Sequence, residues 1–183
     1  ADPPDIEFQV SGQGFVDGSY VSRNSLITIT IQDEHGVDMS PGKFQLYLDD
    51  QIQGTDTYSL HDTVDSPSHV TVTWHTSLDR GPHTLYAAAS DINGNSIISE
   101  PVEFTVEGRL SIKYLGNHPN PFRRETVFAY LLTDEADSFV LEIFTVAGRL
   151  IKRFSGGTYG GADYHEIPWD GTDTWGNEIA NGV

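Results

Sequence analysis

The sequence contains no cysteine among its 183 residues. A disulfide framework, a thiolate zinc site and a cysteine nucleophile are therefore excluded within these residues. A small secreted domain without disulfides depends for its stability on a well-packed core or on bound metal ions.

Positive charge is also scarce. Ten Lys and Arg residues face 27 Asp and Glu residues, and the formal net charge is −17. Such a chain repels nucleic acid and anionic lipid, because binding to either needs positive charge, and we expect no nucleic-acid partner. The acidic residues are scattered, which is typical of a solvated surface; attraction of calcium is the functional alternative.

Long apolar runs are missing as well. No stretch of 18 apolar residues occurs, so we expect no membrane span. The first four residues, Ala1 to Pro4, show neither the basic nor the apolar region of a signal peptide. We therefore expect that a signal was removed or that the chain is part of a longer protein.

Helical periodicity is poor throughout. Short runs of alternating β-branched and aromatic residues occur instead, separated by Gly, Asp, Asn and Pro, which is the pattern of β-sandwiches and barrels. About seven strands are expected up to residue 106, the number in an immunoglobulin-like sandwich. The clearest predicted strands are residues 6–10, 25–32, 44–48, 70–74, 83–90 and 101–106.

Turn signals separate these predicted strands. They fall at residues 33–36, at Asp49-Asp50, and at residues 79–82 and 91–95. Residues 107–109, Glu-Gly-Arg, predict a short junction with limited swing. The predicted domains are therefore an immunoglobulin-like sandwich over 1–107 and a second sandwich over 108–183.

The second predicted sandwich has one strand fewer than its spacing suggests. Its expected strands are residues 110–115, 126–132, 139–144, 149–154 and 165–169. Residues 119–122, Pro-Asn-Pro-Phe, predict a rigid extended turn, because each proline restrains itself and its predecessor.

Four segments of this second part carry a family resemblance. Residues 115–122, LGNHPNPF, resemble the N-x-P-N-P-F opening of the FlgD-like immunoglobulin domain and of type IX secretion C-terminal sorting domains. Residues 140–150, 169–177 and 180–183 then resemble the later family motifs V-x-I-Y-x-x-x-G-R-L-V, W-D-G-x-D-x-x-G and A-x-G-V-Y-x-Y.

The resemblance implies a module for protein secretion and cell-surface attachment, recognised by protein partners in the secretion machinery. We expect the partner contact at residues 117–122 and 169–176. The family pattern continues after "G-V" into a last strand, so we expect the final strand to be truncated here. A partner could then add a strand to the exposed sheet edge.

The first part also has a likeness. Residues 14–22, 33–37, 46–50 and 81–85 look like the region that follows the catalytic domain in gingipain-type cysteine peptidases. The resemblance implies that this chain is the C-terminal part of a larger secreted bacterial protein, located outside the cell or at its surface. The catalytic Cys of such a peptidase is not in this sequence.

No catalytic residue is assigned, and we expect that the chain itself is not an enzyme. None of the seven histidines stands in an H-E-x-x-H or H-x-x-x-H motif, and no G-x-S-x-G elbow occurs. His35, His83 and His118 lie in turn signals. The acidic pairs Asp33-Glu34 and Asp49-Asp50 are interpreted as turn residues.

Calcium is the best chemical alternative, although no metal ligand and no cofactor is assigned. Asp91, Asn93 and Asn95 alternate as oxygen ligands do, and Asp170, Asp173 and Asn177 offer a second set. The first set is equally a hairpin turn in which Gly94 supplies a positive φ.

Binding of carbohydrate is the alternative function, as an accessory module of an extracellular enzyme. Exposed aromatic faces would provide the stacking surface. We expect Trp169 in the core and Trp175 exposed in a turn. A third possibility is a fragment that regulates an absent catalytic domain. The aromatic candidates are Trp74, Tyr159, Tyr164, Trp169 and Trp175.

Overall fold

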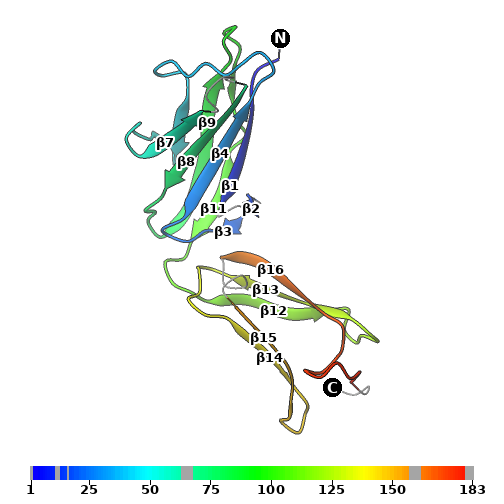
Figure 1. Cartoon of the computed structure of the whole chain (residues 1–183). Coiled ribbons are helices and arrows are strands. Elements are labelled where there is room, and N and C mark those ends of the chain that lie inside the picture. The colour runs from blue at the N-terminus through cyan, green and yellow to red at the C-terminus, as the bar shows by residue number, and fades with distance from the viewer. Residues whose placement is uncertain (1, 11–12, 16, 63–67, 157–161, 180–183) are drawn as a thin grey trace. The chain divides into compact units, whose positions relative to one another are not determined.

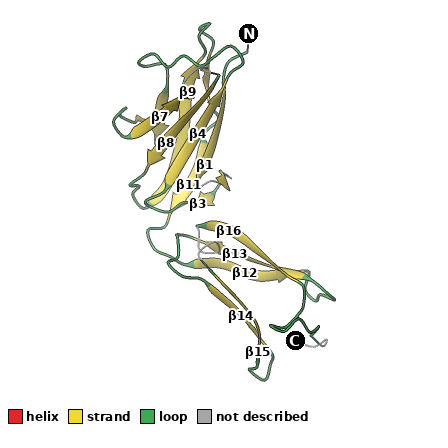
Figure 2. Ribbon diagram, in the orientation of Figure 1, coloured by secondary structure: helices red, strands yellow, loops and turns green. Residues whose placement is uncertain are grey.

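The computed structural model describes residues 2–10, 13–15, 17–62, 68–156 and 162–179. The chain forms two compact units, Ala1–Val106 and Glu107–Val183, one residue from the boundary expected from the sequence. All regular elements of the described residues are β-strands (Figure 2), so the predicted all-β class is confirmed. Within these residues no helix is long and apolar enough to span a membrane.

The first unit consists of two sheets (Figure 1). One sheet has the order β2 (Gln13–Gly14), β1 (Asp5–Val10), β4 (Leu26–Gln32), β8 (His69–His75) and β7 (Tyr58–Asp62). The other has the order β3 (Ser19–Tyr20), β11 (Val102–Val106), β9 (Gly81–Ser90), β5 (Gln45–Leu48) and β6 (Gln51–Ile52), with β10 (Ser96–Ile98) also paired to β9.

Alternation along the strands produces the core of this unit. In β4, Ile27, Ile29 and Ile31 are all fully buried, because successive side chains of a strand point to opposite faces. Ile29 stands opposite Val72 of β8, which is also fully buried. These isoleucines therefore form the inward face of the strand.

The second unit also has two sheets. The larger has the order β12 (Ile112–His118), β13 (Thr126–Leu132) and β16 (Asp163–Trp169), and the smaller pairs β14 (Val140–Phe144) with β15 (Leu150–Ser155). Tyr130 of β13 stacks on Phe139 with ring centroids 4.8 Å apart. Leu141 and Phe154 of the smaller sheet pack on the same core. Two facing sheets around one core form a β-sandwich.

Several sequence expectations need correction. The described first unit contains eleven strands instead of about seven. The additional strands are short ones, such as β2 in one sheet and β6 and β10 in the other. Gly81 and Pro82, predicted as a turn, belong to β9. β12 starts later than predicted and continues to His118, so Asn117 lies in a strand. The expected truncation concerns residues from 180 onward, which lie outside the described residues.

Candidate functional site

The two segments expected to contact a partner, residues 117–122 and 169–176, meet inside the second unit. Phe122 packs against Trp169 with ring centroids 5.5 Å apart, and Phe128 lies against the same indole at 5.8 Å. The indole is 4% exposed, and its Nε1–H donates to the carbonyl oxygen of Thr172 at 2.9 Å. Trp169 therefore lies in the core, as expected, and its contact with Phe122 holds the two segments together.

Side-chain amides and a hydroxyl fix the course of the first segment. The Asn117 Nδ2 group donates to Thr126 Oγ1 at 3.2 Å, and Thr126 Oγ1–H donates to the carbonyl oxygen of Pro119 at 2.9 Å. Asn120 Nδ2 donates to Asn117 Oδ1 at 3.2 Å. Because Thr126 is buried, its hydroxyl needs such partners. The asparagines of the motif thus have a structural role in this corner.

The backbone conformation at Gly171 explains why the W-D-G segment has a glycine at this position. Its φ is +69°, in the left-handed region that side chains disfavour. A Cβ atom at this position would come within 2.5 Å of the carbonyl oxygen of Arg124. The two segments can therefore approach this closely only with glycine at residue 171.

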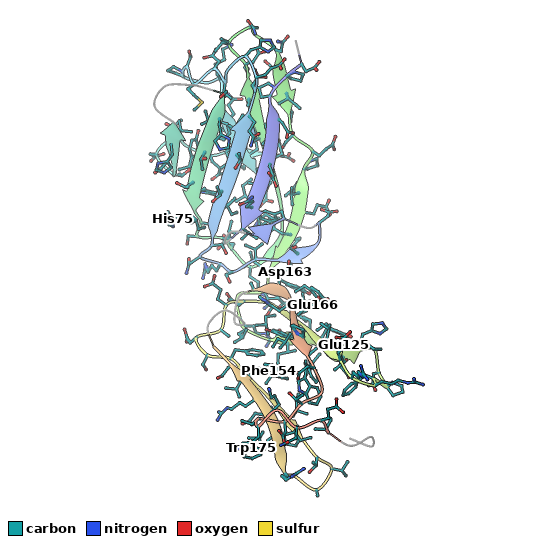
Figure 3. The ribbon with its side chains drawn as sticks, turned by 45° about the vertical axis from the view of Figure 1, so that its right-hand side comes forward. His75, Glu125, Phe154, Asp163, Glu166 and Trp175 are labelled. Atoms are coloured by element: carbon teal, nitrogen blue, oxygen red, sulfur yellow. The ribbon has the colours of Figure 1, made fainter. Side chains whose placement is uncertain are left out.

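A hollow of about 400 Å³ lies beside this corner. Its wall includes the indole of Trp169 and, from the smaller sheet, Phe154 and Lys152, while Glu125 lines it from the loop before β13 (Figure 3). Apolar surface with a few charged groups is the usual lining of a binding site. Among the described residues, the lining consists of Pro119, Glu125, Thr126, Val127, Lys152, Phe154, Pro168, Trp169 and Asp170.

The hollow was not predicted from the sequence, although β15 carries a signal for it. The strand is unusually basic, with Lys152 followed by Arg153 and preceded by Arg149. Lys152 Nζ donates a long hydrogen bond of 3.4 Å to the carbonyl oxygen of Asp173, and Arg153 Nε lies 3.4 Å from Glu142 Oε1. These contacts are partly exposed and contribute little stability.

The two oxygen-rich loops proposed for calcium are the same turn, formed once in each unit. Asp91 Oδ1 accepts the backbone N–H groups of Asn93 and Asn95 at 2.9 and 2.7 Å. Asp173 Oδ1 accepts those of Trp175 and Asn177, both at 2.9 Å. In both turns the intervening glycine has a positive φ, and the asparagine side chain donates to the carboxylate.

The donors of these turns lower the pKa of both carboxyl groups. Burial alone would raise the pKa of Asp91, but the side-chain and backbone donors of Asn95 and Asn93 outweigh it. The Asn177 backbone N–H is the largest cause of the lowered pKa of Asp173. The carboxylates are therefore already used as acceptors inside the turns. In the described part of the chain no group of three or more His, Asp and Glu side chains is arranged as a metal site.

The aromatic candidates for sugar binding separate into two classes. Trp74 and Trp169 are 5% and 4% exposed, so neither offers a stacking face. Trp175 is 78% exposed at the tip of its turn, as expected, and lies at the opposite end of the second unit from Asp163 (Figure 3). Tyr164 is half-exposed, and Tyr159 lies outside the described residues.

Two of the three histidines expected in turns lie in strands instead. His83 lies in β9 and His118 ends β12, whereas His35 does lie in a bend. His83 Nδ1 is 2.7 Å from Asp49 Oδ2, and its Nε2 is 2.8 Å from the carbonyl oxygen of Asp79. Burial lowers the pKa of His83, but these acceptors outweigh it and the pKa is raised.

Comparison with solved structures gives a match over both units. The chain is similar to part of dimeric latent PorU from Porphyromonas gingivalis, with 23% sequence identity and a TM-score of 0.50. The match covers 98% of this chain and 18% of that chain, so this chain spans less than a fifth of that protein. At this identity the likeness shows a shared fold. No family model and no curated protein matches the sequence.

Proposed function

We propose that this chain is a non-catalytic pair of modules from a larger secreted bacterial protein. Its second unit is the part that the secretion or surface-attachment machinery recognises. The observation that carries the proposal is the corner at Trp169, where two segments resembling the sorting-domain motifs pack together. The fold match to a portion of PorU, over both units in tandem, supports the same assignment.

The surface of the second unit supports a protein partner. Ten of the fifteen exposed large hydrophobic side chains of the described residues belong to this unit. Exposed apolar surface of this kind marks interaction sites. Recognition would use a folded surface, with no bond made or broken. The ten residues are Leu110, Ile112, Tyr114, Leu115, Val140, Phe144, Val146, Leu150, Tyr164 and Trp175.

Export of a fused reporter tests the proposal. The whole chain is placed behind a folded reporter enzyme and produced in a bacterium that has a type IX secretion system. We expect the reporter outside the cell, where added protease degrades it, while the reporter alone stays inside. Accumulation of the folded, soluble fusion inside the cell would contradict the proposal.

Carbohydrate binding is the second candidate, favoured by the 78% exposure of Trp175. An indole exposed at the tip of a turn can stack on a sugar ring. Binding to a glycan array that is lost in Trp175→Ala, with unchanged thermal unfolding, would support this function. If the substitution abolishes export and the array stays empty, Trp175 contacts a protein instead.

A further inference from the structure

The outer edge of β15 exposes backbone groups that a second strand could use. The carbonyl oxygen of Ile151 accepts the N–H of Thr174 at 3.0 Å, so it points away from β14. Backbone groups alternate in direction along an antiparallel strand, so the N–H and C=O of Arg153 point the same way. No residue in the described ranges forms a hydrogen bond with this outward N–H or C=O.

The contact with Thr174 indicates that this edge already accepts a neighbouring chain segment. Thr174 donates both its backbone N–H and its hydroxyl to the Ile151 carbonyl, each at 3.0 Å. It lies in a turn between the bridged residues Thr172 and Glu178, so only one residue of β15 is covered in this way. The remaining edge extends over the three residues that follow Lys152.

The hollow next to this edge has the place and lining for side chains of an added strand. Lys152 and Phe154 are two residues apart, so they share a face of β15, and both line the hollow of about 400 Å³. Phe154 is only half-buried, and the smaller sheet has two strands against the three of the larger sheet. Every second side chain of a strand paired to β15 would enter this hollow.

Charge selects among possible strands. Arg149, Lys152 and Arg153 make β15 and its approach basic, with Glu142 beside Arg153 and with Glu125 and Asp170 in the lining of the hollow. Seven of the ten Lys and Arg residues of the chain lie in this second unit. A strand with acidic side chains would therefore meet complementary charge, which favours its association.

We propose that the outer edge of β15 binds an extended segment of a partner protein in which apolar or aromatic residues alternate with acidic ones. The segment adds one strand to the β14–β15 sheet. Its apolar side chains fill the hollow over Phe154 and Trp169, and its acidic side chains face Arg153. This site adds to the proposed function but does not depend on it, because strand addition can occur whether or not the chain is exported.

Hydrogen exchange with a designed peptide tests the site. The probe is a capped peptide of about eight residues, slightly longer than the six-residue β15, in which Val and Tyr alternate with Asp and Glu. We expect the Arg153 amide to exchange rapidly in the free chain and at least about tenfold more slowly with saturating peptide. Protection of this amide in dilute free chain would mean that the edge is already covered, and would overturn the proposal.

Matched peptides separate strand pairing from simple attraction. A peptide with N-methyl groups on alternate residues loses every N–H donor on one edge, and the methyl groups keep a neighbouring strand from approaching that edge, while the charge and side chains are unchanged. The two alternate methylation patterns should differ, one abolishing protection of the Arg153 amide and the other retaining it. A peptide with Lys in place of the acidic residues should bind at least about tenfold more weakly. Equal binding by all four peptides would overturn the proposal.

Two variants of the chain locate the binding edge. Arg153→Pro removes the outward N–H but no bond to β14, and proline is tolerated at such positions of an edge strand. Arg153→Ala keeps that N–H and removes only the side chain. We expect the peptide to lose binding to the proline variant and to bind the alanine variant more weakly. Should Arg153→Pro fold poorly, the methylated peptides with the unaltered chain decide the question.

The same measurements distinguish other occupants and the proposed function. If Arg153 becomes protected only as the chain concentration rises, with formation of a dimer, the edge pairs with a second copy and the proposal is overturned. If the peptide binds but the reporter fusion stays inside the cell, the site stands and the export function fails. If export proceeds normally in Arg153→Pro while the peptide does not bind the unaltered chain, the site fails alone.

Discussion

The two units have the same architecture but distribute their apolar side chains in opposite ways. Among the described residues, the first unit buries eighteen hydrophobic side chains and the second buries six, although the second is only moderately shorter. The second unit exposes ten large hydrophobic side chains and the first exposes five. The first unit therefore has the larger core, whereas the second exposes more apolar surface, the kind of surface on which the proposed partner contact relies.

The same turn occurs in both units, so the burial of equivalent residues can be compared directly. Asp91 and Asp173 organise the same five-residue turn with the same hydrogen bonds. Asp91 is fully buried, whereas Asp173 is half-buried. The second turn also carries the exposed Trp175 where the first carries Asn93. The same local structure is therefore buried in one unit and carries an exposed indole in the other.

The largest expected effect tests whether the first core is self-sufficient. Ile29→Ala empties a fully buried position in β4 and should lower the free energy of unfolding by about 2–5 kcal/mol, because a cavity adds to the lost burial. Chemical denaturation followed by near-ultraviolet circular dichroism and hydrogen exchange measures the loss. Exchange in the strands of the second unit should stay unchanged, and equal destabilisation of both units would contradict separate cores.

A second substitution tests the corner at Trp169. Gly171→Ala should cost about 2–4 kcal/mol in the second unit, because the new Cβ meets the Arg124 carbonyl oxygen at 2.5 Å and the φ is +69°. Gly176→Ala is the matched control. It has a φ of +82° but nothing within 4 Å of the new Cβ, so about 1–2 kcal/mol is expected. Denaturant unfolding measures the free energy of unfolding of both variants. Equal losses would show that the two segments of this corner can move apart without an additional cost.

The paired turns allow a direct comparison of burial. Asp91→Asn and Asp173→Asn each place an amide opposite the asparagine side chain that donated to the carboxylate. We expect the larger fall in melting temperature for Asp91→Asn, since the unmatched group is buried there. Both lowered pKa values imply stability that is present above pH 3.8 and is lost as the pH falls through the folded-state pKa.

Added calcium should change neither melting temperature.

The smallest expected effect concerns His83, which belongs to the first unit only. Its pKa is raised above 6.5, so protonated His83 contributes stability that is present below pH 6.5 and is lost as the pH rises through the folded-state pKa. Melting temperatures between pH 5 and pH 9 should show a decline in this window that His83→Gln removes. A decline that persists in the variant would assign it to another group.

The sequence was sufficient for the strands that are buried on one face. Ile27, Ile29 and Ile31 in β4 alternate with threonines, and that period identifies the strand and its inward face. β7 was not predicted, because Tyr58 to Asp62 is largely polar and becomes a strand through its pairing with β8. The end of β12 was missed because Gly116 and Asn117 have low strand propensity, which pairing with β13 overrides.

Only part of the candidate site could be predicted from the sequence. Trp169 was predicted to be in the core and Trp175 to be exposed, and both predictions are confirmed. The hollow beside Phe154 could not be predicted, because it depends on β15 lying next to the ends of β13 and β16. The same limit applies to the edge at Arg153, whose direction follows from a hydrogen bond between residues far apart in the sequence.

The uneven distribution of charge has a further consequence. Residues 1–106 contain sixteen acidic and three basic residues, a formal charge of −13, whereas residues 107–183 contain eleven and seven, a formal charge of −4. Mutual repulsion between the acidic first units opposes the association of two copies of the chain. This repulsion weakens as added salt screens the charges.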